Sequence, residues 1–175
     1  MPDAPVDEND IRDCAALRTH NAALGRDPQR MPMPWTDGPN AGFTSPGIKP
    51  WLPIPGWASR VSVAEQEVEP DSTLRMVRSL IRYRQTNDAL LHGTLAVLSD
   101  DDDVVLLLRE SPRETLLVAI SLTERRQTVA LLDGQWTTDW ATSAHLIGRT
   151  FTRTAEVDGL EALILRRTEP APQTG

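Results

Sequence analysis

The sequence predicts a mainly β protein, an antiparallel β-sandwich preceded by an irregular Pro/Trp-rich loop and one helix. The loop is indicated by residues 28–57, which hold eight of the fourteen prolines and three of the five tryptophans. An apolar stripe at helical spacing indicates the helix, and short apolar runs separated by turn residues after Gly93 indicate the sandwich. The 175 residues give room for one ordinary domain with an appendage.

The loop over residues 28–57 is too rich in proline for regular helix or sheet, because proline lacks the amide donor. It is also too aromatic for a simple linker, so we expect it to pack against a larger body or to line a binding site. Residues 1–24 are acidic at first and carry mixed local signals. We expect them to form a loop with one short helical turn.

The next regular element is a helix predicted over residues 71–86. Pro70-Asp71-Ser72 is a helix start signal, and Asn87 is a stop signal. A lone amphipathic helix must bury its apolar stripe, and the sandwich offers no obvious second layer for it, so we expect part of its natural partner to be missing. The stripe comprises Leu74, Val77, Leu80 and Ile81, and a basic face typical of solvated helices comprises Arg75, Arg78 and Arg82.

The chain after Gly93 predicts consecutive antiparallel strands, because its apolar runs are short and closely spaced. We expect the sandwich to occupy residues 93–168 and the tail over residues 169–175 to be disordered. The four acids of residues 100–103 are typical of a solvated hairpin tip and match no calcium loop. The five expected strands cover residues 94–98, 104–109, 115–121, 127–132 and 159–167.

The composition excludes several classes of function. A net charge of −7 with a single lysine, Lys49, argues against a nucleic-acid surface, which requires clustered Lys and Arg. The single cysteine, Cys14, excludes an intramolecular disulfide and suits a reducing cytoplasm, where we expect the protein to be located. No signal peptide or membrane span is visible, so we expect no membrane partner. No phosphate loop, dinucleotide fingerprint or credible metal set is present, so we expect no cofactor and no metal.

Part of the loop has a family resemblance. The string Gly25-Arg-Asp-Pro-Gln-Arg30-Met-Pro-Met-Pro-Trp35, followed by Pro39-Asn-Ala-Gly-Phe-Thr44 and Pro50-Trp-Leu-Pro53, resembles the α-glucosidase and oligo-1,6-glucosidase branch of the α-amylase superfamily of glycoside hydrolases. In that branch the string follows the eighth strand of a (β/α)8 barrel. The resemblance implies that residues 1–90 are a remnant of the barrel, with its eighth helix at residues 71–86, and that residues 93–168 are the C-terminal β-sandwich.

The resemblance also implies what the chain lacks. Retaining glycosidases use two carboxylates that flank the scissile bond, and this family carries them on earlier barrel strands. Because a whole barrel takes about 250 residues, we expect a C-terminal fragment that has no catalytic residue and is inert alone. Its parent would act, with retention, on terminal α-linked glucose of short oligosaccharides. Met31 and Pro34 stand where the family usually has Thr and Gln, which blurs the subfamily.

Substrate binding is assigned by the resemblance to Arg26, Arg30 and Trp51. A guanidinium can grip a carboxylate that holds a sugar hydroxyl, and an aromatic plane can stack on a sugar face. The residues do not decide which arginine contacts the site, since either could instead hold the loop through a salt bridge to Asp27 or Asp37. Loop-structural roles are expected for Asp27, Trp35 and Phe43, and packing in the sandwich or at an interface is expected for Trp136 and Trp140.

Two other functions stay open. A stand-alone, non-catalytic carbohydrate-binding or interaction module predicts a stable monomer with glucoside affinity, whereas a fragment predicts an exposed apolar stripe on helix 71–86. A fragment of a transglycosylating relative, of the trehalose synthase or sucrose isomerase type, would share the loop. The partners expected for the fragment are α-glucoside oligosaccharides and the missing catalytic barrel.

Overall fold

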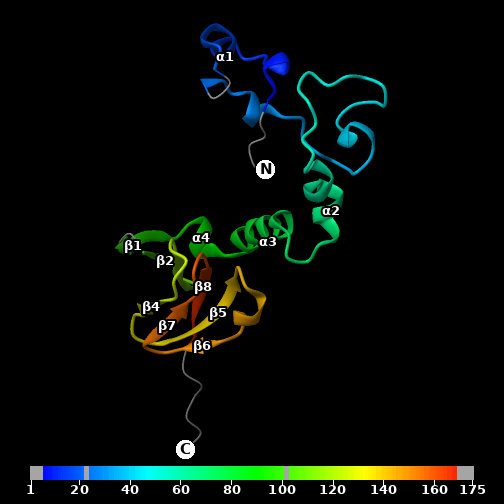
Figure 1. Ribbon diagram of the computed structural model, residues 1–175. Helices are drawn as coiled ribbons and strands as arrows, with labels where there is room; N and C mark the ends of the chain where they lie inside the picture. The colour runs from blue at the N-terminus through cyan, green and yellow to red at the C-terminus, as the bar shows by residue number, and fades with distance from the viewer. Residues whose placement is uncertain (1–5, 22–23, 101–102, 169–175) are drawn as a thin grey trace, which may run out of the picture. The chain divides into compact units, whose positions relative to one another are not determined.

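The computed structural model describes residues 6–21, 24–100 and 103–168, and the chain divides between Val77 and Arg78 into two units (Figure 1). The expected disordered tail, residues 169–175, and the middle of the expected acidic hairpin tip lie outside the described residues. In the described part of the chain, no helix is long and apolar enough to cross a membrane.

The first unit consists of short helical elements joined by irregular chain, as its proline content predicts. Its small apolar cluster consists of the buried Met31 and Leu52, against which Val6 and Trp57 pack. No strand is assigned among the residues of this unit that the structure describes. The elements are η1 (Glu8–Asp10), α1 (Cys14–Thr19), η3 (Asp27–Arg30), η4 (Pro39–Gly42), η5 (Ala58–Val61) and α2 (Val63–Val68).

The second unit is an antiparallel β-sandwich, as predicted. A six-stranded sheet has the order β1-β2-β3-β8-β5-β6, and a two-stranded sheet pairs β4 with β7. Consecutive strands β1, β2 and β3 are joined as hairpins, whereas β8 returns to pair with both β3 and β5. The strands are β1 (Thr94–Asp100), β2 (Val104–Glu110), β3 (Thr115–Ser121), β4 (Gln127–Ala130), β5 (Gln135–Ala141), β6 (Thr150–Phe151), β7 (Thr154–Val157) and β8 (Ala162–Thr168), with η6 (Ala144–Leu146) after β5.

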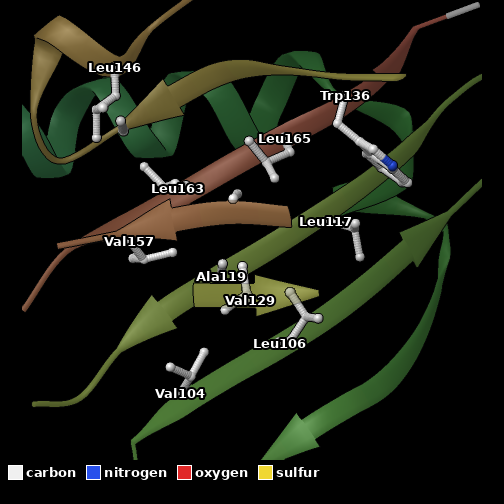
Figure 2. Packing of buried hydrophobic residues seen from close by; sticks show 12 residues of the cluster. Val104, Leu106, Leu117, Ala119, Val129, Trp136, Leu146, Val157, Leu163 and Leu165 are labelled. Atoms are coloured by element: carbon white, nitrogen blue, oxygen red, sulfur yellow. The ribbon is translucent and has the colours of Figure 1, made fainter. Parts of the chain in front are cut away.

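The main core lies between the two sheets of the second unit. Alternate side chains of the strands point into it, because successive residues of a strand face opposite sides of a sheet. Trp136 is fully buried there, and its indole Nε1 donates to the main-chain oxygen of Leu132 at 2.8 Å. Figure 2 shows this core, which includes Val104, Leu106, Leu117, Ala119, Val129, Trp136, Leu146, Val157, Leu163 and Leu165.

The outer face of the six-stranded sheet carries a second apolar cluster. Two helices contribute to it: α3 (Thr73–Thr86) through Tyr83, and α4 (Asp88–Leu91) through Ala89 and Leu90. Trp140 of β5 is 8% exposed in this cluster, and its indole Nε1 donates to Ser79 Oγ at 3.0 Å. Trp136 therefore packs in the core between the two sheets, and Trp140 packs on the outer face beside α3 and α4, so the expected packing in the sandwich or at an interface is found for both.

A polar network accompanies that outer cluster, and Arg166 of β8 lies at its centre. The Arg166 guanidinium donates to Asp139 Oδ2 at 2.5 Å, to Glu114 Oε2 and to Asn87 Oδ1. Tyr83 donates its hydroxyl to the same Asp139 oxygen at 3.1 Å. Desolvation and the Asp139 charge raise the pKa of Tyr83, so the hydroxyl stays protonated and keeps its role as donor. The network ties the end of α3 to strands β5 and β8.

The helix α3 begins at Thr73, two residues after the predicted start, because Ser72 acts as its cap. The Ser72 hydroxyl accepts from the Arg75 amide at 3.3 Å. No residue of α3 is buried. Three residues of the predicted apolar stripe are exposed, Val77 at 44%, Leu80 at 37% and Ile81 at 51%, whereas Leu74 is partly buried; Met76 beside the stripe is 36% exposed.

Three strands were not anticipated by the sequence analysis. β5, β6 and β7 fall in residues 135–157, where polar and apolar residues alternate and no continuous apolar run is present. The alternation in β7 places Ala155 and Val157 in the core and leaves Thr154 and Glu156 exposed. The fifth predicted strand, 159–167, corresponds to β8, which starts at Ala162 after a turn in which Leu160 has a φ of 56°.

Candidate functional site

The short helix η3 (Asp27–Arg30) carries the charged residues of the predicted sugar loop. Asp27 is only 2% exposed, and its Oδ2 accepts from the main-chain amides of Arg12 and Asp13 at 2.6 and 2.8 Å. Its other oxygen, Oδ1, is buried and accepts no hydrogen bond from the described residues. Asp27 therefore ties the loop to the segment before α1, in agreement with the ordering role expected for it.

The partner of Arg30 is Asp13, a residue outside the predicted loop. Arg30 Nη1 lies 3.6 Å from Asp13 Oδ2, and the Asp13 side chain is 6% exposed whereas that of Arg30 is 44% exposed. The suggestion that the loop arginines pair with Asp27 or Asp37 is therefore wrong for Arg30. Asp27 is 2% exposed and binds two main-chain amides through Oδ2, whereas the half-exposed Arg30 side chain lies within ion-pair distance of Asp13.

Asp13 also caps α1, and this role explains its electrostatics. Its Oδ1 accepts from the Ala15 amide at 2.8 Å, the geometry of an N-cap. That hydrogen bond, with those from the Arg26 and Ala16 amides and the charge of Arg30, lowers the pKa of Asp13 in spite of burial. Asp13 is thus a carboxylate that holds its negative charge at neutral pH.

Arg26 differs from Arg30 in its side chain. It precedes η3 at the N-cap position, with φ of −103° and ψ of 7°, and it is exposed. Within residues 6–21, 24–100 and 103–168, no ion pair involves its guanidinium, whereas Arg30 has the pair with Asp13. Among the described residues, Arg26 is therefore the loop arginine whose guanidinium has no carboxylate partner.

The aromatic residues of the loop are exposed in the structure. Trp35 is 48% exposed, Phe43 is 42% exposed and Trp51 is 50% exposed. Trp51 is held through its main chain, since its carbonyl accepts from Arg12 Nε at 3.4 Å, which leaves the ring open to stacking. The expected anchoring of the loop by the ring of Trp35 stays a prediction, because the contacts that hold Trp35 here are those of its main chain.

The loop between Trp35 and Ile48 is shaped by Asn40, which the sequence analysis did not single out. Asn40 and Ala41 have φ of 52° and 51°, in the left-handed region that Asn tolerates well. The Asn40 amide donates to the main-chain oxygens of Ser45 and Ile48 at 2.9 and 2.8 Å. The Trp35 amide donates to the carbonyl of Ala41 at 2.8 Å. The Pro39-Asn-Ala-Gly string is the signal that could have indicated this turn.

Neither a metal cluster nor the groove of the sandwich rivals the loop as a candidate site in the described part of the chain. Among the described residues, no group of three or more His, Cys, Asp or Glu side chains could hold a metal ion. A groove of about 900 Å³ lies in the second unit, between strands β1 and β2 of one sheet and β4 of the other. It is lined mainly by Leu, Val, Thr and Ala side chains and contains no residue of the predicted sugar loop. The arrangement of Arg26, Trp51 and the braced η3 is therefore the candidate site.

Comparison with known proteins places these features in a family. Residues 1–93 match the model of the alpha-amylase catalytic domain. The chain is 35% identical over 132 residues to an oligo-1,6-glucosidase of Heyndrickxia coagulans, a match that covers 75% of this chain and 23% of the relative. It is 31% identical over 100 residues to an alpha-glucosidase of Schizosaccharomyces pombe, covering 56% and 17%.

The fold has a counterpart of known structure. A crystal structure of the alpha-glucosyl transfer enzyme XgtA superposes with a TM-score of 0.80 at 28% identity, covering 96% of this chain and 31% of that chain. The match includes both units and thus agrees with the predicted sandwich after a loop and helix. The chain spans about a quarter or less of the length of the two curated relatives above.

Proposed function

The chain belongs to the α-amylase family, and from this membership we propose that it forms the last barrel loop, the last barrel helix and the C-terminal sandwich of an α-glucosidase-type glycoside hydrolase. The whole protein would hydrolyse terminal α-linked glucose of short oligosaccharides with retention of configuration. The resemblance of the Gly25–Trp35 string to this branch agrees with the match to an oligo-1,6-glucosidase. The substrate class rests on the activities of such relatives.

The observation that carries this proposal is the unequal use of the two loop arginines. Arg30 is held by the nearly buried Asp13, whereas Arg26 has no carboxylate partner among the described residues. We assign to Arg26 the contact with the sugar, directly or through a carboxylate that holds a sugar hydroxyl, because its planar guanidinium can donate two parallel hydrogen bonds. Trp51, with its ring half exposed, would stack on a sugar face.

The remaining loop residues have supporting roles in the proposal. Arg30 braces η3 against Asp13, and Asp27 fixes the main chain that leads into α1. Asp27 is unsuited to acid/base work because it is buried and already accepts two amide hydrogen bonds. We expect Trp35 and Phe43 to shape the loop within the whole protein.

The two carboxylates that break the glycosidic bond would come from other parts of the whole protein. A retaining glycosidase needs them about 5–5.5 Å apart on either side of the bond, one as nucleophile and the other as acid and base. The residues of this chain would bind and orient the sugar. We therefore propose that the isolated 175-residue chain is catalytically inert.

A catalytic barrel would also cover the exposed apolar stripe of α3. The division into a barrel remnant at residues 1–90 and a sandwich at residues 93–168 is supported by the family match, which ends at residue 93. The exposed stripe of α3, with Val77, Leu80 and Ile81, is the surface expected to pack against the rest of the barrel. The single cysteine supports a reducing compartment, and we propose the cytoplasm.

The experiment is to isolate the native protein from its source cells with an antibody raised against residues 93–168. The expected result is a band at about three times the 19.4 kDa mass of this chain, which releases glucose as the α-anomer from isomaltose and maltose. The purified 175-residue chain is the control and should show no turnover. A native band at 19.4 kDa without turnover would contradict the hydrolase proposal and favour a stand-alone binding module.

Transglycosylation is the second candidate, and the match to the alpha-glucosyl transfer enzyme XgtA favours it. The same assay separates it from hydrolysis, because a transferase produces new oligosaccharides or isomerised disaccharides in place of free glucose. Hydrolysis is preferred here because the curated relatives are an oligo-1,6-glucosidase and an alpha-glucosidase. A predominance of transfer products from the native protein would reverse this preference.

A further inference from the structure

We propose that Asp13, which lies outside the Pro/Trp-rich loop, is the positioning residue of the candidate sugar site, because it holds Arg30 in place and so leaves Arg26 as the arginine that meets the ligand. The role of Asp13 in holding Arg30 is inferred from the geometry of the first unit. Its consequence for ligand binding rests on the proposed function. Asp13 would touch no substrate and would act through the two arginines.

Both carboxylate oxygens of Asp13 are in use. Oδ1 accepts from the Ala15 amide at 2.8 Å, which caps α1, and Oδ2 lies 3.6 Å from Arg30 Nη1. The Asp13 side chain is 6% exposed and that of Arg30 is 44% exposed, so solvent reaches this ion pair from the arginine side alone. Asp13 therefore couples the start of α1 to the end of η3.

A second link runs in the opposite direction between the same two segments. The loop residue Asp27 accepts, through Oδ2, from the amides of Arg12 and Asp13. One carboxylate thus extends from η3 to the segment before α1, and the other extends from that segment back to η3. Two crossed links fix both the spacing and the rotation of the segments, whereas a single hydrogen bond would leave rotation free.

The same segment also contacts the aromatic residue of the site. Arg12 Nε donates to the carbonyl of Trp51 at 3.4 Å, and Asp10 pairs with Lys49 at 3.5 Å. The pair of Asp10 with Lys49 is solvated, with the lysine side chain 79% exposed, so it contributes little. Asp13 is the nearly buried acid of residues 10–13. Its position would determine which arginine meets the ligand and how the ligand approaches Trp51.

Loss of the charge at position 13 would alter the site in a defined way. Without it Arg30 has no carboxylate partner among the described residues, and its guanidinium would compete with Arg26 for the same anionic or hydroxyl groups of the ligand. The Asp13→Asn substitution keeps the size and one acceptor oxygen for the α1 cap but removes the charge that holds Arg30. The substitution therefore tests the positioning of Arg30 while it keeps the cap on which the folding of α1 depends.

The first arm of the test uses the 175-residue chain and NMR of the arginine Nε–H groups. We expect Asp13→Asn to shift the Arg30 signal and to increase its exchange with water at least tenfold, while Asp13→Glu retains most of the wild-type shift. Asp10→Asn, which removes the solvated pair with Lys49, is the matched control and should leave the Arg30 signal unchanged. An unchanged Arg30 signal in Asp13→Asn would overturn the proposal.

A complementary variant covers the case in which Asp13→Asn fails to fold. Arg30→Gln leaves the α1 cap intact, so the Ala15 amide should stay protected while the titration midpoint of the Asp13 carboxyl rises. No change in that midpoint would show that Arg30 and Asp13 do not interact, and would also overturn the proposal.

The second arm uses the native whole protein and a glucoside substrate. Asp13→Asn should raise KM roughly tenfold and change kcat by less than about threefold, the pattern expected when a binding group is misplaced. Asp10→Asn should change neither value. Equal kinetics for wild type and Asp13→Asn would reject the positioning role. If the wild-type protein turns over no glucoside, the proposed function fails, while the NMR arm still decides whether Asp13 holds Arg30.

Discussion

The two units of this chain are ordered by different means. The sandwich has an apolar core in which Leu117, Trp136 and Leu165 are fully buried. Among the described residues of the first unit, the apolar cluster at Met31 and Leu52 is small, and the loop is held by carboxylates and amides that bind main-chain groups. Apolar burial stabilises the sandwich through many residues, whereas a hydrogen bond stabilises only the groups that it joins. The stability of the first unit therefore depends on a few polar positions that the sandwich does not need.

The difference suits the tasks proposed for the two units. A sugar site needs polar and aromatic side chains at fixed positions, so its loop cannot be filled with aliphatic residues. The loop leaves Trp35, Phe43 and Trp51 exposed and is stiffened by proline and by Asn40. The sandwich carries no such constraint and can bury its large side chains. Substitutions in each unit should reveal this contrast.

The largest expected effect is from Trp136→Ala in the sandwich. Trp136 is fully buried and donates to the carbonyl of Leu132, so its removal leaves a cavity and an unpaired acceptor. The variant should lose about 3–5 kcal/mol of stability in the second unit, as measured by urea unfolding with hydrogen exchange of β3 amides. The control Trp35→Ala, at a half-exposed loop position, should cost less than about 1 kcal/mol. Equal losses in the two variants would remove the contrast between the units.

The second-largest effect is expected from Arg166, whose polar network contrasts with the apolar core of the sandwich. Arg166→Met removes three hydrogen bonds, to Asp139, Glu114 and Asn87, and leaves the carboxylates of Asp139 and Glu114 without their cationic partner. Because the Arg166 side chain is 30% exposed, we expect a reduced cost of about 1–3 kcal/mol.

The loss from Arg166→Met should be localised. Hydrogen exchange should show faster opening of the α4 amides, such as Ala89, than of the core strands, since Glu114 accepts from Ala89 at 2.8 Å. Arg167→Met, at an exposed neighbour that donates to the Asp133 carbonyl, is the matched control and should leave α4 protected. Uniform loss of protection throughout the unit would show that Arg166 supports the core as a whole.

The sequence predicted the sandwich better than the loop, for a physical reason. Continuous apolar runs such as residues 104–109 and 115–121 coincide with β2 and β3, because both lie where side chains of the two faces are covered. β7 was missed because its residues alternate between core and solvent, and β5 was missed because polar residues separate its two buried tryptophans, so neither strand contains a continuous apolar run. A search for strands must therefore include alternating polar and apolar residues as well as continuous apolar runs.

The candidate site was predicted through the resemblance of its loop, and only in part. Arg26, Asp27 and Trp51 are found in the first unit together, but the sequence did not indicate that Asp13 is the partner of Arg30. Asp13 lies fourteen residues before Asp27, and local patterns do not report on contacts at that separation. An acid just before an α-helical turn is an N-cap signal, and that signal was available in Asp13-Cys14-Ala15.

A smaller effect is expected from Asp27→Ala in the loop. The substitution leaves the amides of Arg12 and Asp13 without their acceptor in a nearly buried position, at a cost of about 1–2 kcal/mol to the first unit. Hydrogen exchange of these two amides should accelerate, while the amides of β3 and β8 remain protected. Asp37→Ala, at an exposed loop position, is the control and should change neither set. Protected Arg12 and Asp13 amides in Asp27→Ala would show that another group holds the segment.

The smallest expected effect is the response of the first unit to acid. Because the pKa of Asp13 is lowered in the folded state from its ordinary value of 3.8, its contribution to stability is present above that value and is lost as pH falls through the folded pKa. The groups that face it are the Arg30 guanidinium, the Asp27 carboxylate through the Asp13 amide, and the amides of Ala15 and Arg26. The Ala15 amide signal should therefore titrate with a midpoint below 3.8, and this titration should vanish in Asp13→Asn but persist in Asp10→Asn. A midpoint at or above 3.8 would mean that the α1 cap and Arg30 do not stabilise the Asp13 charge, and that the loop is ordered by Asp27 alone.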